Sequence, residues 1–503
     1  MTTGTKIALA LAALTAAGAA RAQLGVSTPE AEGVPSQAVL NWVDAAEKEI
    51  KWMHSFVLVR HGKVIASGWW DPYRREFPHR LFSHSKSFTS TAVGFAADER
   101  KLDLDETVAG IFPDKLPANP SENLRRLRIR DLLTMNVGSA KEDYFRKDPS
   151  GDWAKAFLAG DFTYAPGTRF KYDSSATYML AEIVERKTGR KMMEYLGEKF
   201  FGPVGITSVV TTYSPSGVPC GGWGMAMTTE DLARFGQFYL QRGQWEGKQL
   251  LSRDWVALAT SKETRSGWSD EDVADSDWYV GYGFQFWRCR HNAFRADGAG
   301  GQFTIVMPDQ DAVFCGTALF GDFQGAFNTI WKHLLPAFGD RALPENPAAL
   351  KALRDRCASL RLPLVEGSAE GPVKTATTWT LKPNAQGFTA ASLTPDAEGW
   401  TLVLRDASGT RTLPVGSGRW RAGEIQMGKQ KYDPLGGLGL LGRQATAANG
   451  AWKGGTFTAD VYFTREAARG GVAIDLSGAK MKATLSMYGA CMADVKVELE
   501  EVE

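Results

Sequence analysis

The stretch LFSHSKSFT at residues 81–89 holds the residues on which the predicted chemistry of this chain depends. Ser83 and Lys86 stand three positions apart, so a helix that begins here would carry both on one face. The residues up to Glu99 are apolar on most sides, which predicts a buried helix over residues 83–99. A serine hydroxyl needs a nearby base, and a buried lysine amine can serve as one. We therefore predict Ser83 as a nucleophile and Lys86 as its base.

The spacing S-x-x-K alone is a weak signal. A second copy, Ser477 with Lys480, lies in a region rich in short strands, and we interpret that copy as chance. Ser83 also has a structural alternative, since serine is favoured at helix N-caps. What favours function is that two further motifs follow the first copy in order along the chain.

The first partner is the stretch FKYDS at residues 170–174, directly before a helix predicted over residues 174–188. A tyrosine at such a junction can point its hydroxyl into a cleft and relay a proton, so Tyr172 is predicted to be catalytic. Ser174 can cap the helix or form a hydrogen bond with Lys86, and we expect it to contact substrate. The alternative for Tyr172 is a core aromatic residue with a bonded hydroxyl.

The second partner is the stretch ADGAGG at residues 296–301, which leads into a strand predicted over residues 302–307. Glycines allow a ligand to approach the backbone closely, so Gly298 is predicted to contact substrate. The backbone N–H of Ala299, together with that of Ser83, is predicted to form an oxyanion hole. Asp297 is interpreted as structural.

The order S-x-x-K, then Y-x-S, then a glycine-rich strand resembles the serine β-lactamase and penicillin-binding-protein superfamily. The resemblance is closer to its class C-like branch of family VIII esterases, D-aminopeptidase-like enzymes and 6-aminohexanoate-dimer hydrolases. It covers about residues 27–340. Four further stretches are similar to that branch: VRHGK at 59–63, DLLTM at 131–135, FGPVGI at 201–206 and DLARFG at 231–236.

The resemblance implies an α/β fold of the α+β type. An antiparallel sheet flanked by helices would be joined to a helical subdomain, with the site between them. It also implies that Ser83 is acylated, that Lys86 and Tyr172 share the proton transfers, and that the amides of Ser83 and Ala299 hold the oxyanion.

One departure from the family pattern concerns substrate charge. β-Lactamases usually carry Lys-Thr-Gly or His-x-Gly on the strand beside the site, where the cation holds a substrate carboxylate. Here that place reads Ala296-Asp297-Gly298, and alternation puts Arg295 on the opposite face from Ala296. The literal KTG at residues 187–189 ends a predicted helix, where its glycine would be a C-terminal cap.

These departures, with Ser174 in place of the commoner asparagine, favour a small-molecule ester or amide substrate. The predicted function is therefore a serine hydrolase with an acyl-enzyme intermediate. Two alternatives stay open, namely a true β-lactamase or D,D-peptidase, and a catalytically silent module that binds cell-wall material.

The N-terminus is typical of an export signal. Lys6 precedes an apolar run, and Ala20-Arg21-Ala22 gives a small-x-small cleavage pattern, so residues 1–22 are predicted to be a signal peptide. The run is too short for a comfortable bilayer span, so we expect a periplasmic or secreted protein without stable membrane insertion after cleavage. An uncleaved anchor is the alternative.

The remaining chain of this 503-residue protein is expected to hold two folded units. A hydrolase domain is predicted over residues 27–340, a linker over 341–372 and a small all-β accessory domain, a barrel or sandwich, over 373–503. Within the first domain, a strand over residues 282–289 and a helix over residues 327–338 are predicted.

Charge and cysteine content exclude other classes. Lys and Arg number 58 against 57 Asp and Glu, so no broad positive surface for nucleic acid is expected. The five cysteines show no C-x-x-C pattern, and we predict neither a metal site nor an organic cofactor.

Overall fold

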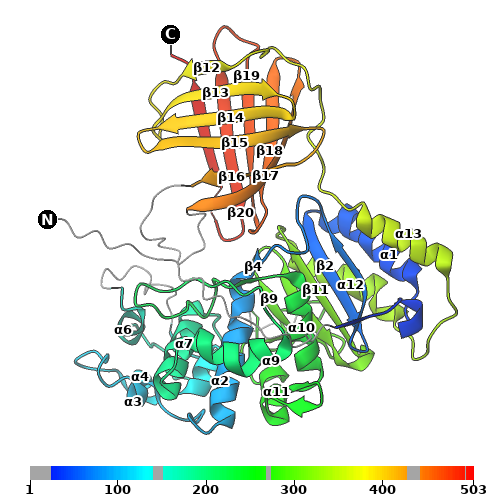
Figure 1. The fold of residues 1–503 in the computed structure, drawn as a ribbon. Coiled ribbons are helices and arrows are strands. Elements are labelled where there is room, and N and C mark those ends of the chain that lie inside the picture. Colours follow the sequence, from blue (N-terminus) through cyan, green and yellow to red (C-terminus); the bar gives the residue numbers. More distant parts are fainter. Residues whose placement is uncertain (1–23, 140–150, 268–273, 428–441, 493, 503) are drawn as a thin grey trace.

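A computed structural model describes residues 24–139, 151–267, 274–427, 442–492 and 494–502. The predicted export signal at residues 1–22 lies outside these ranges. The described chain forms an α/β part, which runs from strand β1 to helix α13, and a β-barrel, which runs from strand β12 to strand β21 (Figure 1).

The α/β part is built on a seven-stranded sheet. The strands are antiparallel except for β1, which pairs with β3 in parallel. Their order across the sheet is β1 (Gly25–Val26), β3 (Lys63–Trp69), β2 (Met53–Arg60), β11 (Ala312–Ala318), β10 (Gln302–Met307), β9 (Phe294–Gly298) and β8 (Trp287–Arg288).

Both faces of the central strands are covered, because alternate side chains enter two different cores. On β2, Phe56 and Leu58 pack on one side, and Val57 and Val59 on the other. The first face is covered by α1 (Ser36–Ala45), α12 (Phe323–His333) and α13 (Pro347–Ala358), and the second by α2 (Ser85–Asp98) and α10 (Thr229–Leu240). Helix α7 (Ser174–Thr188) packs against α2 within the helical subdomain, as Figure 1 shows.

Shorter elements complete the α/β part. They are β4 (His79–Arg80), α3 (Val108–Ile111), α4 (Glu122–Arg126), α5 (Ile129–Leu133), α6 (Trp153–Leu158), α8 (Met192–Leu196), α9 (Gly202–Val204), β5 (Ala226–Met227), β6 (Gln244–Trp245), β7 (Lys248–Gln249) and α11 (Arg253–Thr260).

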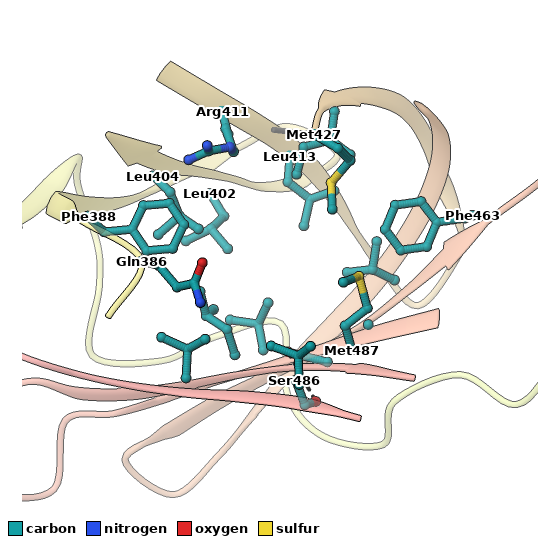
Figure 2. Close-up of a pocket in the computed structure, with 18 residues that line it drawn as sticks. Gln386, Phe388, Leu402, Leu404, Arg411, Leu413, Met427, Phe463, Ser486 and Met487 are labelled. Carbon is teal, nitrogen blue, oxygen red and sulfur yellow. Dashed lines mark hydrogen bonds between the residues drawn. The ribbon is translucent and has the colours of Figure 1, made fainter. Parts of the chain in front are cut away.

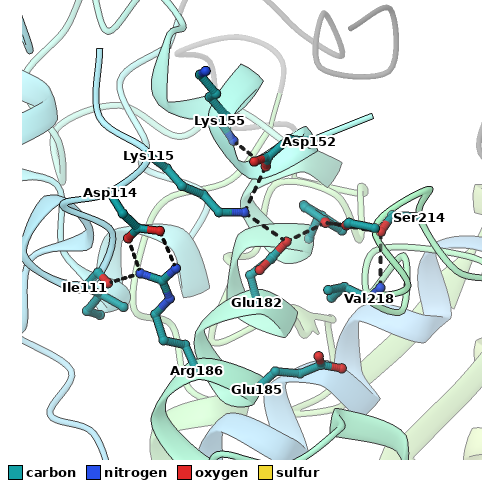
Figure 3. Close-up of polar contacts among 12 residues, drawn as sticks. Ile111, Asp114, Lys115, Asp152, Lys155, Glu182, Glu185, Arg186, Ser214 and Val218 are labelled. Atoms are coloured by element: carbon teal, nitrogen blue, oxygen red, sulfur yellow. Dashed lines mark hydrogen bonds and ion pairs between the residues drawn. The ribbon is translucent and has the colours of Figure 1, made fainter. Parts of the chain in front are cut away.

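A polar network fixes α7 within the helical subdomain (Figure 3). Lys115 Nζ lies 2.9 Å from a carboxylate oxygen of Asp152 and 3.9 Å from one of Glu182, which is on α7. One turn further along α7, Arg186 forms an ion pair with Asp114. These contacts hold the helix whose first turn carries Ser174.

Two predicted elements have different bounds in the structure. The strand predicted over residues 282–289 is reduced to Trp287–Arg288, because Gln285 adopts a left-handed φ of 66° that no strand allows. The helix predicted over residues 327–338 spans Phe323–His333, so it begins four residues earlier and ends five residues earlier than predicted. At its start, the side chain of Asp322 caps the helix by accepting from Gly325 N–H.

The C-terminal part is all β, as predicted, and its sheet closes into a barrel. Strand β12 reaches strand β21 through Lys382 N–H, which donates to Glu500 O, and Val502 N–H, which donates to Thr380 O. The strands are β12 (Thr377–Thr380), β13 (Phe388–Asp396), β14 (Gly399–Asp406), β15 (Gly409–Ser417), β16 (Arg421–Gln426), β17 (Arg443–Lys453), β18 (Thr456–Phe463), β19 (Ala468–Asp475), β20 (Lys482–Gly489) and β21 (Val495–Glu500).

The barrel interior is filled at one end and hollow at the other. Trp400, Trp452 and Phe457 pack against one another in the filled half. The other half encloses a cavity of about 270 Å³ that is lined mainly by apolar side chains (Figure 2).

The two parts share a buried interface. Tyr73 and Tyr462 pack edge to face, and the Tyr73 hydroxyl donates to the Glu466 carbonyl at 3.3 Å. The predicted linker is also packed, since Leu353, Leu360 and Leu362 join the core beneath α1. Across the described ranges, we find no helix with the length and apolar character needed to cross a bilayer.

Candidate active site

A tight turn presents Ser83 at the start of α2. A 3-10 turn over Phe82–His84 leads directly into the helix, and Phe82 adopts a left-handed φ of 48°, which is unusual for a residue with a side chain. Leu81 N–H donates to Met225 O at 2.8 Å, and His84 N–H donates to Leu81 O at 3.2 Å. These bonds hold the strained turn from both sides.

The glycine-rich strand end packs directly on this turn. A Cβ atom at Gly298 would lie 1.9 Å from the carbonyl oxygen of Leu81. No other residue fits here without moving backbone, so Gly298 sets the distance between β9 and the turn that carries Ser83. Ala299, the next residue, packs against Phe82. The structure thus brings Ser83, Gly298 and Ala299 together.

Lys86 is 1% exposed and its ammonium nitrogen reaches three oxygen atoms. It lies 2.9 Å from Ser83 Oγ, 3.0 Å from Ser174 Oγ and 2.8 Å from the carbonyl oxygen of Gly222. A carbonyl can only accept, whereas a hydroxyl can accept or donate. A neutral amine here can therefore donate to Gly222 and Ser174 and accept the Ser83 proton, which is the arrangement a base requires.

Tyr172 completes this group. Its hydroxyl forms a hydrogen bond with Ser83, and Lys86 Nζ lies 4.8 Å from the centre of its ring. The ring stacks on Trp287 at a centroid distance of 5.5 Å. Burial raises the pKa of Tyr172, and the hydrogen bond to Ser83 opposes this only in part. The phenol is thus protonated at neutral pH and can donate to a nearby oxygen.

Trp287, which stacks on Tyr172, also contacts Arg295, and Arg295 forms an ion pair with Asp297. Arg295 is fully buried and donates from Nε to Asp297 at 2.8 Å. Its guanidinium lies 4.5 Å from the ring centre of Trp278 and 5.4 Å from that of Trp287. A buried, paired guanidinium cannot bind a substrate carboxylate at the cleft.

Three histidines could each act as a base if they lay beside Ser83, but each has another partner. His84 Nε2 lies 2.8 Å from Thr304 Oγ1 on β10, and His79 pairs with His54 at 2.9 Å. His291 packs against Trp331. The second S-x-x-K copy is also accounted for, because Ser477 donates to Asp475 in the turn between β19 and β20.

Two contributors were missed by the sequence analysis. The Gly222 carbonyl contacts Lys86, but the pair Gly221-Gly222 signals only a turn. Gln285 accepts from Thr177 at 2.6 Å and donates to Leu133 O at 2.8 Å, and Ser87 donates to its backbone oxygen at 2.7 Å. Gln285 thereby links α2, α5 and α7, a role that no local pattern predicts.

The barrel also reaches the site, through two turns that we call the Glu466 turn (residues 464–467) and the Cys491 turn (residues 489–492). Arg80 forms a two-point ion pair with Glu466, one contact of which is 2.7 Å. In the second turn, Ala490 packs in an apolar cluster with Phe82, and Cys491 is exposed. Among the described residues, no group of three or more His, Cys, Asp or Glu side chains is arranged to hold a metal ion.

Comparison with known sequences defines the class. A sequence model described as β-lactamase matches residues 53–318, from β2 to β11. The chain belongs to the β-lactamase family of serine hydrolase-type enzymes.

Two relatives and one solved structure show how similar individual proteins are to this chain. The chain is 27% identical over 284 residues to a 6-aminohexanoate-dimer hydrolase from Paenarthrobacter ureafaciens, which covers 52% of this chain and 70% of the relative. It is 29% identical over 162 residues to a D-aminopeptidase from Brucella canis, which covers 30% and 31% of the two chains. Among solved structures, a family VIII carboxylesterase aligns with a TM-score of 0.46 and 18% identity, over 62% of this chain and 99% of the other.

Proposed function

We propose that this protein cleaves an ester or amide bond through an acyl-enzyme on Ser83. The single observation that carries the proposal is the position of Lys86 Nζ, which is buried and 2.9 Å from Ser83 Oγ. The membership of the β-lactamase family and the resemblance to a 6-aminohexanoate-dimer hydrolase support it.

In the first step, Ser83 Oγ attacks the substrate carbonyl carbon and its proton passes to Lys86. The backbone amides of Ser83 and Ala299 stabilise the negative charge that develops on the carbonyl oxygen. Tyr172 and Lys86 then deliver the proton to the leaving alcohol or amine as its bond to carbon breaks. Water attacks the acyl-enzyme in the second step, and a carboxylic acid and free Ser83 result. Ser174 and Gly298 contact the substrate.

The substrate is proposed to lack a carboxylate beside the scissile bond. The cation that would hold one is absent from residues 296–298, and Arg295 is buried and paired with Asp297. This favours neutral esters and linear amides over β-lactams and D-Ala-D-Ala peptides.

The proposal includes export by the segment 1–22 and the division into a hydrolase domain over 27–340, a linker over 341–372 and an accessory domain over 373–503. Cleavage between Ala22 and Gln23 would leave Gln23 as the mature N-terminus. N-terminal sequencing of the protein isolated from its native host tests this prediction.

Turnover of a panel of neutral esters, linear amides and penicillins tests the proposed reaction. We expect esters or amides to be hydrolysed, Ser83→Ala to abolish turnover, and Ser477→Ala, from the second S-x-x-K copy, to leave it unchanged. Equal turnover by Ser83→Ala and the unchanged protein would overturn the proposal. Faster turnover of penicillins than of esters would favour the β-lactamase alternative.

A further inference from the structure

We infer that the barrel is part of the active site. The Glu466 turn positions the segment that carries Ser83, and the Cys491 turn packs against the same segment through Ala490. This inference rests on the proposed function, because it assigns roles around the same serine.

The positioning role follows from an ion pair close to the nucleophile. Arg80 stands three residues before Ser83 and binds Glu466 through two of its nitrogens. Both side chains are largely buried, at 14% and 10% exposure, so the pair is shielded from solvent. In addition, Arg80 N–H donates to Arg465 O at 2.9 Å. The barrel therefore forms hydrogen bonds with both the backbone and the side chain of Arg80.

The same turns pack against the residues next to the predicted oxyanion hole. Phe82 and Ala299 share a small apolar cluster with Ala467 and Ala490, one from each barrel turn. At Gly300, a Cβ atom would lie 2.8 Å from the Cβ of Ala490 and 3.1 Å from that of Ala467. The barrel thus contacts the two segments that flank the predicted oxyanion hole.

The positioning role is tested with Glu466→Gln, which keeps the shape of the side chain but removes its charge. We expect kcat and the rate of Ser83 phosphonylation by a fluorophosphonate to fall on the order of 10-fold or more, with little change in KM. The matched control is Glu498→Gln, which removes a barrel carboxylate paired with Lys496, and should act like the unchanged protein. An unchanged phosphonylation rate in a folded Glu466→Gln protein would overturn the positioning role. Arg80→Gln gives a second variant if the first fails to fold.

If Ser83 is never phosphonylated in the unchanged protein, the proposed function fails instead of the positioning role, so the two failures are distinguishable.

A second inference rests on a separate observation, the cavity inside the barrel. We propose that it binds one aliphatic chain with a polar end. Its lining is mainly apolar, and Arg411 and Gln386 stand on one side of it near Phe388 (Figure 2). Gly470 lies on the same face of β19 as the buried Val472 and contributes no side chain, which leaves the space open. An apolar cavity of about 150 Å³ holds benzene, so 270 Å³ suits a chain of on the order of ten carbon atoms.

Titration calorimetry of the full-length protein with decanoate and with decanol tests this. We expect one molecule bound per chain and at least tenfold weaker binding by Gly470→Leu, which fills the cavity. Ala473→Leu, on the same strand, should bind like the unchanged protein, and Val472→Phe replaces Gly470→Leu if that variant does not fold. Absence of binding by the unchanged protein, or equal binding by Gly470→Leu, would overturn the proposal.

Discussion

Lys86 Nζ lies 2.9 Å from Ser83 Oγ inside a site where the lysine is 1% exposed. Most lysines keep their charge in water, and burial of an unpaired ammonium is costly. In this position the amine has two hydroxyls and one carbonyl as partners. The same contacts place the amine beside the serine hydroxyl.

Removal of the amine should therefore stop acylation. For Lys86→Met, which keeps the length of the side chain, we expect the acylation rate to fall by roughly 10²–10⁴-fold, the usual contribution of a positioned base. Stopped-flow measurement of the burst with a chromogenic ester checks this. Lys480→Met, in the second S-x-x-K copy, is the control, and a normal burst in Lys86→Met would exclude the lysine as base.

The hydroxyl of Tyr172 can be removed without loss of its ring. Tyr172→Phe retains the stacking on Trp287 and removes only the bond to Ser83, so kcat should fall on the order of 10²-fold with a nearly unchanged melting temperature. Steady-state kinetics and calorimetry on the same sample check both parts. A variant with full kcat would mean that the tyrosine is only a packing residue.

Gly298 has a stringent steric role. In Gly298→Ala, the added methyl would meet Leu81 O at 1.9 Å, and backbone must move on one side or the other. We expect a destabilisation of about 3 kcal/mol and loss of turnover, measured by urea unfolding and ester hydrolysis. Gly197→Ala is the matched control, since nothing lies within 4 Å of a Cβ there. Equal stability of the two variants would show that β9 is farther from the turn than described.

Acid should destabilise the protein through its buried histidines. Burial lowers the pKa of His79 to about 4 and that of His84 to about 3, both from a usual value near 6.5. Between these values the unfolded chain binds protons that the folded chain does not, so stability is complete above about pH 6.5 and falls as the pH is lowered toward 4.

The slope of this loss can be assigned to one side chain. Each such histidine contributes about 1.4 kcal/mol per pH unit inside the window. Urea unfolding between pH 7 and pH 4.5 should therefore give a shallower slope for His79→Gln than for the unchanged protein. Parallel slopes for the two proteins would contradict a neutral His79 in the folded state.

The sequence was informative where chemistry depends on local order along the chain. Ser83 and Lys86 share one helix start, and the capping glycine of α7 is Gly189 as predicted, with a φ of 70°. The family resemblance gave the α/β fold, and alternating short strands gave the all-β C-terminal part. The strand predicted over residues 282–289 was wrong over most of its length. Aromatic residues alternate there as they do in a strand, and nothing in the local sequence indicates the left-handed φ of Gln285.

What the sequence could not predict are contacts between segments far apart in the chain. Arg80 and Glu466 are separated by 386 positions, and neither belongs to a motif. Their pairing depends on how the barrel packs against the α/β part, and this depends on the surfaces of both parts after they have folded. The Gly222 carbonyl is similarly invisible, since any residue carries one and only the path of the chain brings it to Lys86.

The most direct test of the central claim is intact mass spectrometry of the purified protein after reaction with a fluorophosphonate, followed by peptide mapping. We expect a single adduct on Ser83 that is lost in Lys86→Ala and retained in Lys480→Ala. A folded protein with no adduct at Ser83, or an adduct that forms equally fast without Lys86, would contradict the central claim.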